Sequence, residues 1–185
     1  MLNEPLAANQ QTLAPSTLAP FKSFEEATHY LLDEAHFLKV LHLSYWYLEF
    51  KGGLPDQVIW VSTYHPEYMS QYMQRFTPMG DPVMAQVMDD RVIDWAEWQS
   101  ADGVLEEALK TASKYGLTKY GISMPLPARG EDKIIFSVCV DSNDVVWPSQ
   151  RGVLARRFKP FAMAFSARLM PLIAAGQRGT SVYAL

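Results

Sequence analysis

The sequence has little of what an extracellular or membrane protein needs. It contains a single cysteine, Cys139, so no disulfide can form within the chain. No run approaches the roughly 18 uncharged apolar residues of a membrane-spanning helix. The N-terminus also lacks the basic and then apolar segments of a secretory signal. These absences predict a cytoplasmic protein that does not interact with a membrane.

Motifs of catalysis and metal binding are missing as well. His29, His36 and His42 are separated by seven and six residues, which does not give the i, i+4 pair of a helical metal site. There is no Gly-x-Ser-x-Gly nucleophile elbow, no phosphate loop and no dinucleotide-binding glycine pattern. Cys139 lies in an apolar run, where a buried and inert thiol is expected. We therefore predict no catalytic residue, no metal and no cofactor, and expect a protein that is not an enzyme. An enzyme of unrecognised type stays an alternative, because catalytic residues can lie far apart in the sequence.

Excess positive charge is also absent. The chain has 16 lysines and arginines against 20 aspartates and glutamates, a formal net charge of −4. A protein that reads a nucleic-acid groove normally presents a basic face, because phosphate neutralisation supplies most of its affinity. A local basic cluster at 151–159 indicates a solvated helix face. We expect no nucleic-acid contact by these residues.

The length and composition fit one globular domain. With 185 residues, of which 49% are hydrophobic, the chain can bury a core and also enclose a small-molecule cavity. Residues 1–20 show no sustained periodicity and predict a flexible N-terminal arm. Residues 21–176 form the predicted domain. Residues 177–185 form a C-terminal tail, either the start of a linker or the end of an excised piece.

The apolar periodicity alternates between helical and strand-like segments. Ser23 and Glu26 form a capping-box pattern at the start of a helix predicted over 24–42. The aromatic-rich segment 44–50 and the segment 57–62 predict an antiparallel pair. Further helices are expected at 66–76, from Pro82, at 103–115 and at 149–174. Gly116 should end the third of these helices, and Pro160 should kink the fourth. Further strands are expected at 120–126 and 134–140. This order predicts an α+β fold with helices packed on a mostly antiparallel sheet.

A cluster of phenols close to one carboxylate is the most distinctive feature. Tyr68 and Tyr72 are four residues apart and share a helix face, and Tyr64 lies one turn earlier. Their rings offer apolar surface tipped with hydroxyls, and an ionised Asp81 accepts hydrogen bonds only, which suits an amide N–H. The same residues also fit an ordinary core helix, followed by Asp81 as the N-cap of the next helix. The pattern alone leaves both interpretations open.

Taken together, these residues resemble the autoinducer-binding domain of LuxR-type quorum-sensing regulators. That family carries Tyr-x-x-x-Trp-x-x-x-Tyr, then Asp-Pro-Val nine residues on, a later tryptophan, and a Gly-Val/Leu-Ser/Thr-x-Pro-Leu strand. The matching residues here are Tyr64, Tyr68, Tyr72, Asp81-Pro82-Val83, Trp95 (with Trp98 as an alternative) and Gly121-Ile122-Ser123-Met124-Pro125-Leu126. Ser137 lies in the next strand, where the family often places a hydroxyl that contacts the ligand. The similarity covers roughly residues 25–174.

The resemblance implies an antiparallel sheet between two helical layers, with an N-acyl-homoserine lactone bound between sheet and helices. The implied ligand-binding residues are Tyr64, Tyr68, Tyr72, Asp81, Val83, Trp95 and Ser137. Tyr68 departs from the family, whose tryptophan donates to the lactone carbonyl, so the donor here would be a phenol. Family members normally continue into a helix-turn-helix domain, which this chain is too short to contain. Any DNA contact would be made through such a separate domain.

Three functions follow from this resemblance. The first is a receptor domain for an acyl-homoserine lactone, acting as a homodimer. The second is a sensor of the same fold with a different small ligand, which Tyr68 motivates. The third is a truncated regulator that pairs with a full-length one, which the end of the chain at Leu185 motivates.

The segment 149–174 is the expected dimer surface. It has more large apolar residues than one packed stripe needs, so some are expected to face outward and form the contact. The alternative is that the kink at Pro160 lets both faces of this helix pack on the domain's own core. The large apolar residues are Val153, Leu154, Phe158, Phe161, Phe165, Leu169 and Leu172.

Overall fold

The computed structural model describes residues 19–75, 90–97, 110–177 and 182–184. Its centre is a six-stranded sheet in the order β3-β4-β5-β1-β2-β6, in which every neighbouring pair is antiparallel. The strands are β1 His42–Lys51, β2 Leu54–Ser62, β3 Ile93–Asp94, β4 Gly121–Leu126, β5 Lys133–Cys139 and β6 Val182–Ala184. The helices are α1 Phe24–Leu38, α2 Pro66–Arg75 and α5 Trp147–Ala174.

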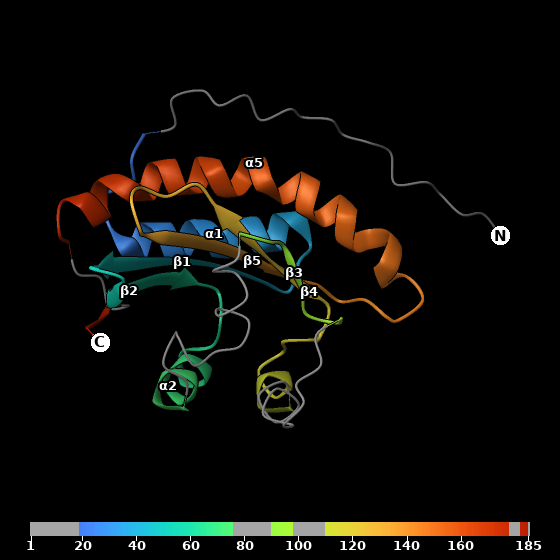
Figure 1. Ribbon diagram of the computed structural model, residues 1–185. Coiled ribbons are helices and arrows are strands. Elements are labelled where there is room, and N and C mark those ends of the chain that lie inside the picture. The colour runs from blue at the N-terminus through green and yellow to red at the C-terminus, as the bar shows by residue number, and fades with distance from the viewer. Residues whose placement is uncertain (1–18, 76–89, 98–109, 178–181, 185) are drawn as a thin grey trace.

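The sheet lies between two helical layers. Helices α1 and α5 run along one face, and α2 lies on the opposite face together with a helical turn at 110–113 (Figure 1). The predicted α+β class and the α-β-α arrangement are therefore confirmed. Within the described residues, no helix is both long and apolar enough to cross a bilayer.

The start of α1 follows the predicted capping pattern, but its end does not. The Ser23 hydroxyl accepts from the Glu26 amide at 3.1 Å, and the Glu26 carboxylate accepts from the Lys22 amide at 2.7 Å. The helix ends at Leu38 rather than near residue 42, because Lys39 adopts a left-handed conformation with φ of 55°. The Lys39 amide donates to the carbonyls of Ala35 and His36 in the last turn. This arrangement ends the helix before β1.

An aromatic core fills the face under α1 and α5. Alternate residues of β1 point into it, as expected for a strand with both faces covered. Phe165 is 1% exposed, and its ring centroid lies 5.2 Å from that of Phe21 and 5.5 Å from that of Tyr45. Phe136 of β5 joins the same cluster at 6.4 Å. We refer to this cluster as the aromatic core.

Helix α5 is one element that continues through Pro160 and arches along the sheet (Figure 1). Some of its seven large apolar side chains are predicted to face outward, and this holds for Val153 alone, while the others lie inward. They recur every three or four residues and so form a single inward stripe. The buried members are Phe158, Phe161, Phe165, Leu169 and Leu172, while Leu154 is partly buried and only Val153 is exposed, at 52%.

Two strands are absent from the sequence prediction. β3 has two residues and β6 has three, and a period of two cannot be recognised over such lengths. β6 lies within the segment predicted as a C-terminal tail and pairs with β2 at the edge of the sheet. The helix predicted over 103–115 is described only from residue 110, and Gly116 ends it at a φ of 82°, as expected for its stop.

Candidate functional site

The sheet face under α2 carries a row of three buried serines. Ser44 of β1 pairs in register with Ser137 of β5, and Ser137 pairs with Ser123 of β4. Their exposed fractions are 0%, 5% and 1% respectively. Buried strand positions are usually apolar, so three hydroxyls side by side across the sheet form an unusual polar stripe. We call these residues the serine row.

Indole groups and a phenol converge on the serine row. The Ser123 and Ser137 hydroxyls are 2.8 Å apart, and the Trp95 indole donates to Ser123 at 2.9 Å. At the other end, the Trp46 indole donates to the Ser44 hydroxyl at 3.2 Å, and Ser44 donates to the Tyr64 hydroxyl at 3.1 Å. Among the described residues, no buried side-chain nitrogen or oxygen lacks a hydrogen-bond partner. The row is thus a preorganised polar strip within aromatic surroundings.

The three predicted tyrosines form one continuous aromatic wall. Tyr64 precedes α2 and packs edge-on against Tyr68 at 5.8 Å, and Tyr68 lies 6.0 Å from Tyr72. Tyr72 then contacts Trp46 of β1 at 5.8 Å, which joins the helix to the sheet. The structure therefore brings these tyrosines together on one helix face, as their spacing predicts.

Trp95 follows β3 and lies flat against the backbone of β4. Its amide donates to the Gly121 carbonyl at 2.9 Å. A Cβ atom built on Gly121 would lie 2.2 Å from the nearest ring carbon of Trp95, so only glycine allows this contact. Trp95 is the predicted tryptophan that the structure places at the serine row. Asp81 and Val83, like the alternative Trp98 and the helix predicted from Pro82, lie outside the described residues.

Sequence reasoning missed several residues of this face. Ser137 was predicted, but Ser44, Ser123 and Trp46 were not assigned to the site. Ser44 and Trp46 are two apart in β1, so a period of two places them on one face. The signal that could have found the row is a small polar residue at an inward position in each of three strands.

Burial favours the neutral forms of two titratable groups beside this face, His42 and Cys139. Burial lowers the pKa of His42, whose ring packs on Tyr64 at 5.5 Å and whose Nδ1 lies 3.3 Å from the Thr63 carbonyl. Burial raises the pKa of the Cys139 thiol, which is fully buried and accepts from the Thr118 amide. This agrees with the prediction of an inert thiol.

The described part of this face suits a neutral ligand. Its rings provide apolar contact area, and its serine and tyrosine hydroxyl groups can donate to carbonyls. Among the described residues there is no group of histidine, cysteine or acidic side chains that could hold a metal.

A separate groove of about 570 Å³ lies elsewhere, at the β4–β5 turn beside α5. Its lining mixes apolar residues with charged ones that include Asp132, Arg156 and Lys159. None of the serine-row residues or the aromatic-wall tyrosines lines it. The groove is therefore not part of the candidate site.

One family model matches most of this chain, and solved structures share its fold. The family model described as "Autoinducer binding domain" matches residues 23–169. The fold is similar to that of CepR2 from Burkholderia cenocepacia, described as an N-acylhomoserine lactone dependent LuxR family transcription factor. The TM-score is 0.59 at 20% identity, with 82% of this chain and 89% of that chain covered. No curated protein sequence matches the chain significantly.

The fold is also similar to that of two structures of the protein SdiA. One holds SdiA in complex with octanoyl-rac-glycerol and has a TM-score of 0.58 at 15% identity, with 83% of this chain covered. The other, of Escherichia coli SdiA, has a TM-score of 0.59 at 17% identity, with 85% covered. This chain spans 62% and 64% of the length of those two chains. At such identities the likeness establishes the fold.

Proposed function

The chain belongs to the autoinducer-binding domain family of LuxR-type regulators, and on this premise we propose that it is a receptor domain for an N-acyl-homoserine lactone. The observation that carries the proposal is the serine row beneath a wall of tyrosines and tryptophans. A neutral head group with carbonyls needs hydrogen-bond donors inside an apolar enclosure, which this face combines. The proposed role is binding, without a chemical reaction.

We assign the parts of the ligand to residues by their chemistry. Trp95 offers a flat ring for the lactone, and Ser137 offers a hydroxyl to a carbonyl. Tyr64, Tyr68 and Tyr72 surround the acyl amide, and Asp81 accepts its N–H, with Val83 packing nearby. Each buried methylene of the acyl tail adds about 0.8 kcal/mol, and a hydrogen bond to the Asp81 carboxylate adds about 1.5–3 kcal/mol.

A second candidate is a sensor of the same fold for another acyl compound. SdiA, which shares the fold, was crystallised with octanoyl-rac-glycerol, an acyl chain on a neutral polar head. Tyr68 stands where the family has tryptophan, so the donor to the head group is a phenol O–H, which lies at a different distance from the backbone than an indole N–H. Both candidates share an acyl chain and differ in the head group.

The ligand proposal predicts a strong stabilisation on binding. At a free concentration one hundred times the dissociation constant, a ligand that binds only the folded domain adds about 2.7 kcal/mol. N-octanoyl-homoserine lactone is expected to raise the Tm and to be recovered by mass spectrometry from protein expressed in its presence. A response to octanoyl-rac-glycerol alone supports the second candidate. A flat response of the folded domain to both compounds contradicts the two proposals together.

Asp81 is expected to orient the ligand. Asp81→Asn keeps the size of the side chain but loses the charge that favours an amide N–H donor, so affinity for N-octanoyl-homoserine lactone is expected to fall at least about tenfold. Asp33→Asn, on the exposed side of α1, is the control and should bind as the wild type does. Calorimetry measures both. Unchanged affinity in Asp81→Asn would leave Asp81 with only a helix-capping role.

We also propose that the domain forms a homodimer through the outer face of α5. Because most of its large apolar residues point inward, the contact would be made by an uncharged stripe of exposed residues: Pro160, Met163, Ala167 and Pro171. Such a stripe allows close approach of a second helix, and twofold pairing is the commonest closed arrangement. The same stripe would serve a truncated regulator that pairs with a full-length one.

Sedimentation velocity of the ligand-bound domain tests this pairing. Met163→Glu is expected to shift the dimer to monomer, because it places a charge in the apolar contact. Phe37→Glu introduces the same charge at an exposed apolar site on α1 and should leave the dimer intact. If Phe37→Glu alone dissociates the dimer, the interface lies on α1. A monomeric wild type at high micromolar concentration contradicts the dimer.

A further inference from the structure

Two consecutive residues at the edge of the sheet face opposite helical layers. Trp95 contacts Gly121 and Ser123 on the serine-row side. Asp94 points the other way, toward α5, because successive side chains of an extended segment alternate. The short segment after β3 is therefore in contact with both layers of the molecule at once.

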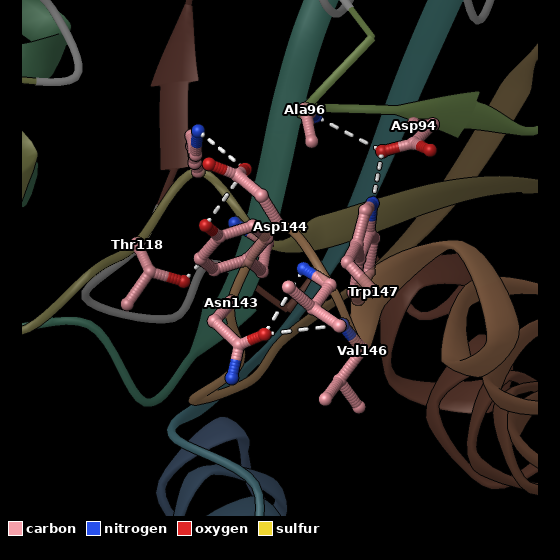
Figure 2. A network of polar contacts seen from close by, with 10 residues as sticks. Asp94, Ala96, Thr118, Asn143, Asp144, Val146 and Trp147 are labelled. Atoms are coloured by element: carbon pink, nitrogen blue, oxygen red, sulfur yellow. Dashed lines mark hydrogen bonds and ion pairs between the residues drawn. The ribbon is translucent and has the colours of Figure 1, made fainter.

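The Asp94 carboxylate is almost fully satisfied by donors from three residues. Its side chain is 11% exposed. One oxygen accepts from the Trp147 indole at 2.8 Å and from the Ala96 amide at 2.9 Å, and the other accepts from Arg151 at 2.8 Å. Figure 2 shows the carboxylate between the Ala96 backbone and the Trp147 ring. Hydrogen bonds to an ionised, largely buried carboxylate are among the strongest in proteins.

The partners of Asp94 belong to the beginning of α5. Trp147 is the first residue of the helix and is 3% exposed, and Arg151 lies one turn further on. Arg151 also pairs with the Glu97 carboxylate, so both ends of the segment 94–97 are attached to the same helix turn. The segment cannot shift without disturbing this turn.

On the sheet side, the segment is held by Trp95, whose amide and indole donate to Gly121 and Ser123 of β4, and by a short strand pairing. β3 pairs with β4 over only two residues, and a strand this short adds few backbone hydrogen bonds. We infer that Asp94 is a positioning residue: it fixes the Trp95 indole over the serine row and couples ligand binding there to the first turn of α5. The coupling part rests on the proposed function. Coupling of this kind is reciprocal. If ligand binding at the serine row alters the conformational equilibrium of the first turn of α5 by some factor, a change in that turn alters ligand affinity by the same factor.

The first test needs no ligand. Asp94→Asn retains an oxygen that can accept from Trp147 but loses the charge that pairs with Arg151. The Trp95 indole proton, which Asp94 does not contact, is expected to exchange with solvent faster in this variant, as measured by NMR. The control is Asp144→Asn, which changes a nearby exposed carboxylate (Figure 2). That carboxylate pairs with Lys119 and Tyr120. This variant should leave the exchange of the Trp95 indole proton unchanged.

The second test measures affinity for N-octanoyl-homoserine lactone by calorimetry. Asp94→Asn is expected to weaken binding about tenfold, although Asp94 does not face the ligand. Arg151→Gln should weaken binding in the same direction. The double variant should lose less than the two single losses added together, since both act through one contact. Asp144→Asn should bind as the wild type does.

The outcomes separate the two proposals. If the wild type does not bind the lactone, the proposed ligand is wrong, while the indole exchange still decides whether Asp94 positions Trp95. Unchanged indole exchange in Asp94→Asn overturns the positioning role. Faster exchange with unchanged lactone affinity, or strictly additive losses in the double variant, overturns the coupling.

Discussion

Replacing Phe165 with alanine is expected to lower the free energy of unfolding by about 3–5 kcal/mol. The ring is 1% exposed and lies between α5 and the sheet, in contact with Phe21, Tyr45 and Phe136. Tyr45 and Phe136 belong to the central strands β1 and β5, and Phe161 belongs to the same helix of 28 residues, so they cannot easily collapse into the space that the ring leaves. The loss therefore includes both the transfer of the ring and the remaining cavity.

Urea denaturation of the variant measures this loss. Phe37→Ala is the matched control, because Phe37 is 75% exposed on α1 and its removal should change stability by no more than about 0.5 kcal/mol. A loss for Phe165→Ala of only about 1 kcal/mol would contradict a close-packed aromatic core. Equal losses for the two variants would do so as well.

Replacing Gly121 with valine is expected to weaken lactone binding by roughly a hundredfold, about 3 kcal/mol. A Cβ atom at this position would lie 2.2 Å from a ring carbon of Trp95, so the indole must leave its place. The ligand then loses the flat ring that we assign to the lactone, and Ser123 loses the indole donor. Because Gly121 lies in a regular strand, without positive φ, the backbone itself accepts valine.

Calorimetry with N-octanoyl-homoserine lactone measures the effect, and tryptophan fluorescence reports the displaced indole. Gly152→Ala is the control, since a Cβ atom there meets only the Arg156 side chain, at 3.6 Å. It should bind as the wild type does. Wild-type affinity in a folded Gly121→Val variant would remove Trp95 from the binding site.

Much of the fold could be predicted because its signals are local. The capping pair Ser23 and Glu26, the turn between β1 and β2, and the stop at Gly116 each depend on residues a few positions apart. The tyrosine wall was predictable for the same reason, since Tyr64, Tyr68 and Tyr72 are one helix turn apart. Periodicity identifies both kinds of feature.

The features that could not be predicted from the sequence depend on contacts between elements that lie far apart along the chain. The serine row exists only because β1, β5 and β4 lie side by side in one register, which joins Ser44 to residues about 80 and 90 positions away. The contact of Asp94 with Trp147 likewise requires β3 to lie beside α5. The inward direction of the α5 phenylalanines follows from the position of the sheet, which the helical pattern alone does not specify.

The two faces of the sheet also separate two kinds of evolutionary change. Substitutions in the aromatic core act on folding, whereas the serine row offers three adjacent sites where serine and alanine side chains differ little in volume. Exchanging Ser44 or Ser123 for alanine would reshape the surface offered to a ligand, but it would also remove the acceptor of the Trp46 or Trp95 indole and so lower stability. At Ser137, in the middle of the row, the same exchange leaves both indoles bonded, so a change of ligand contact there costs the fold least.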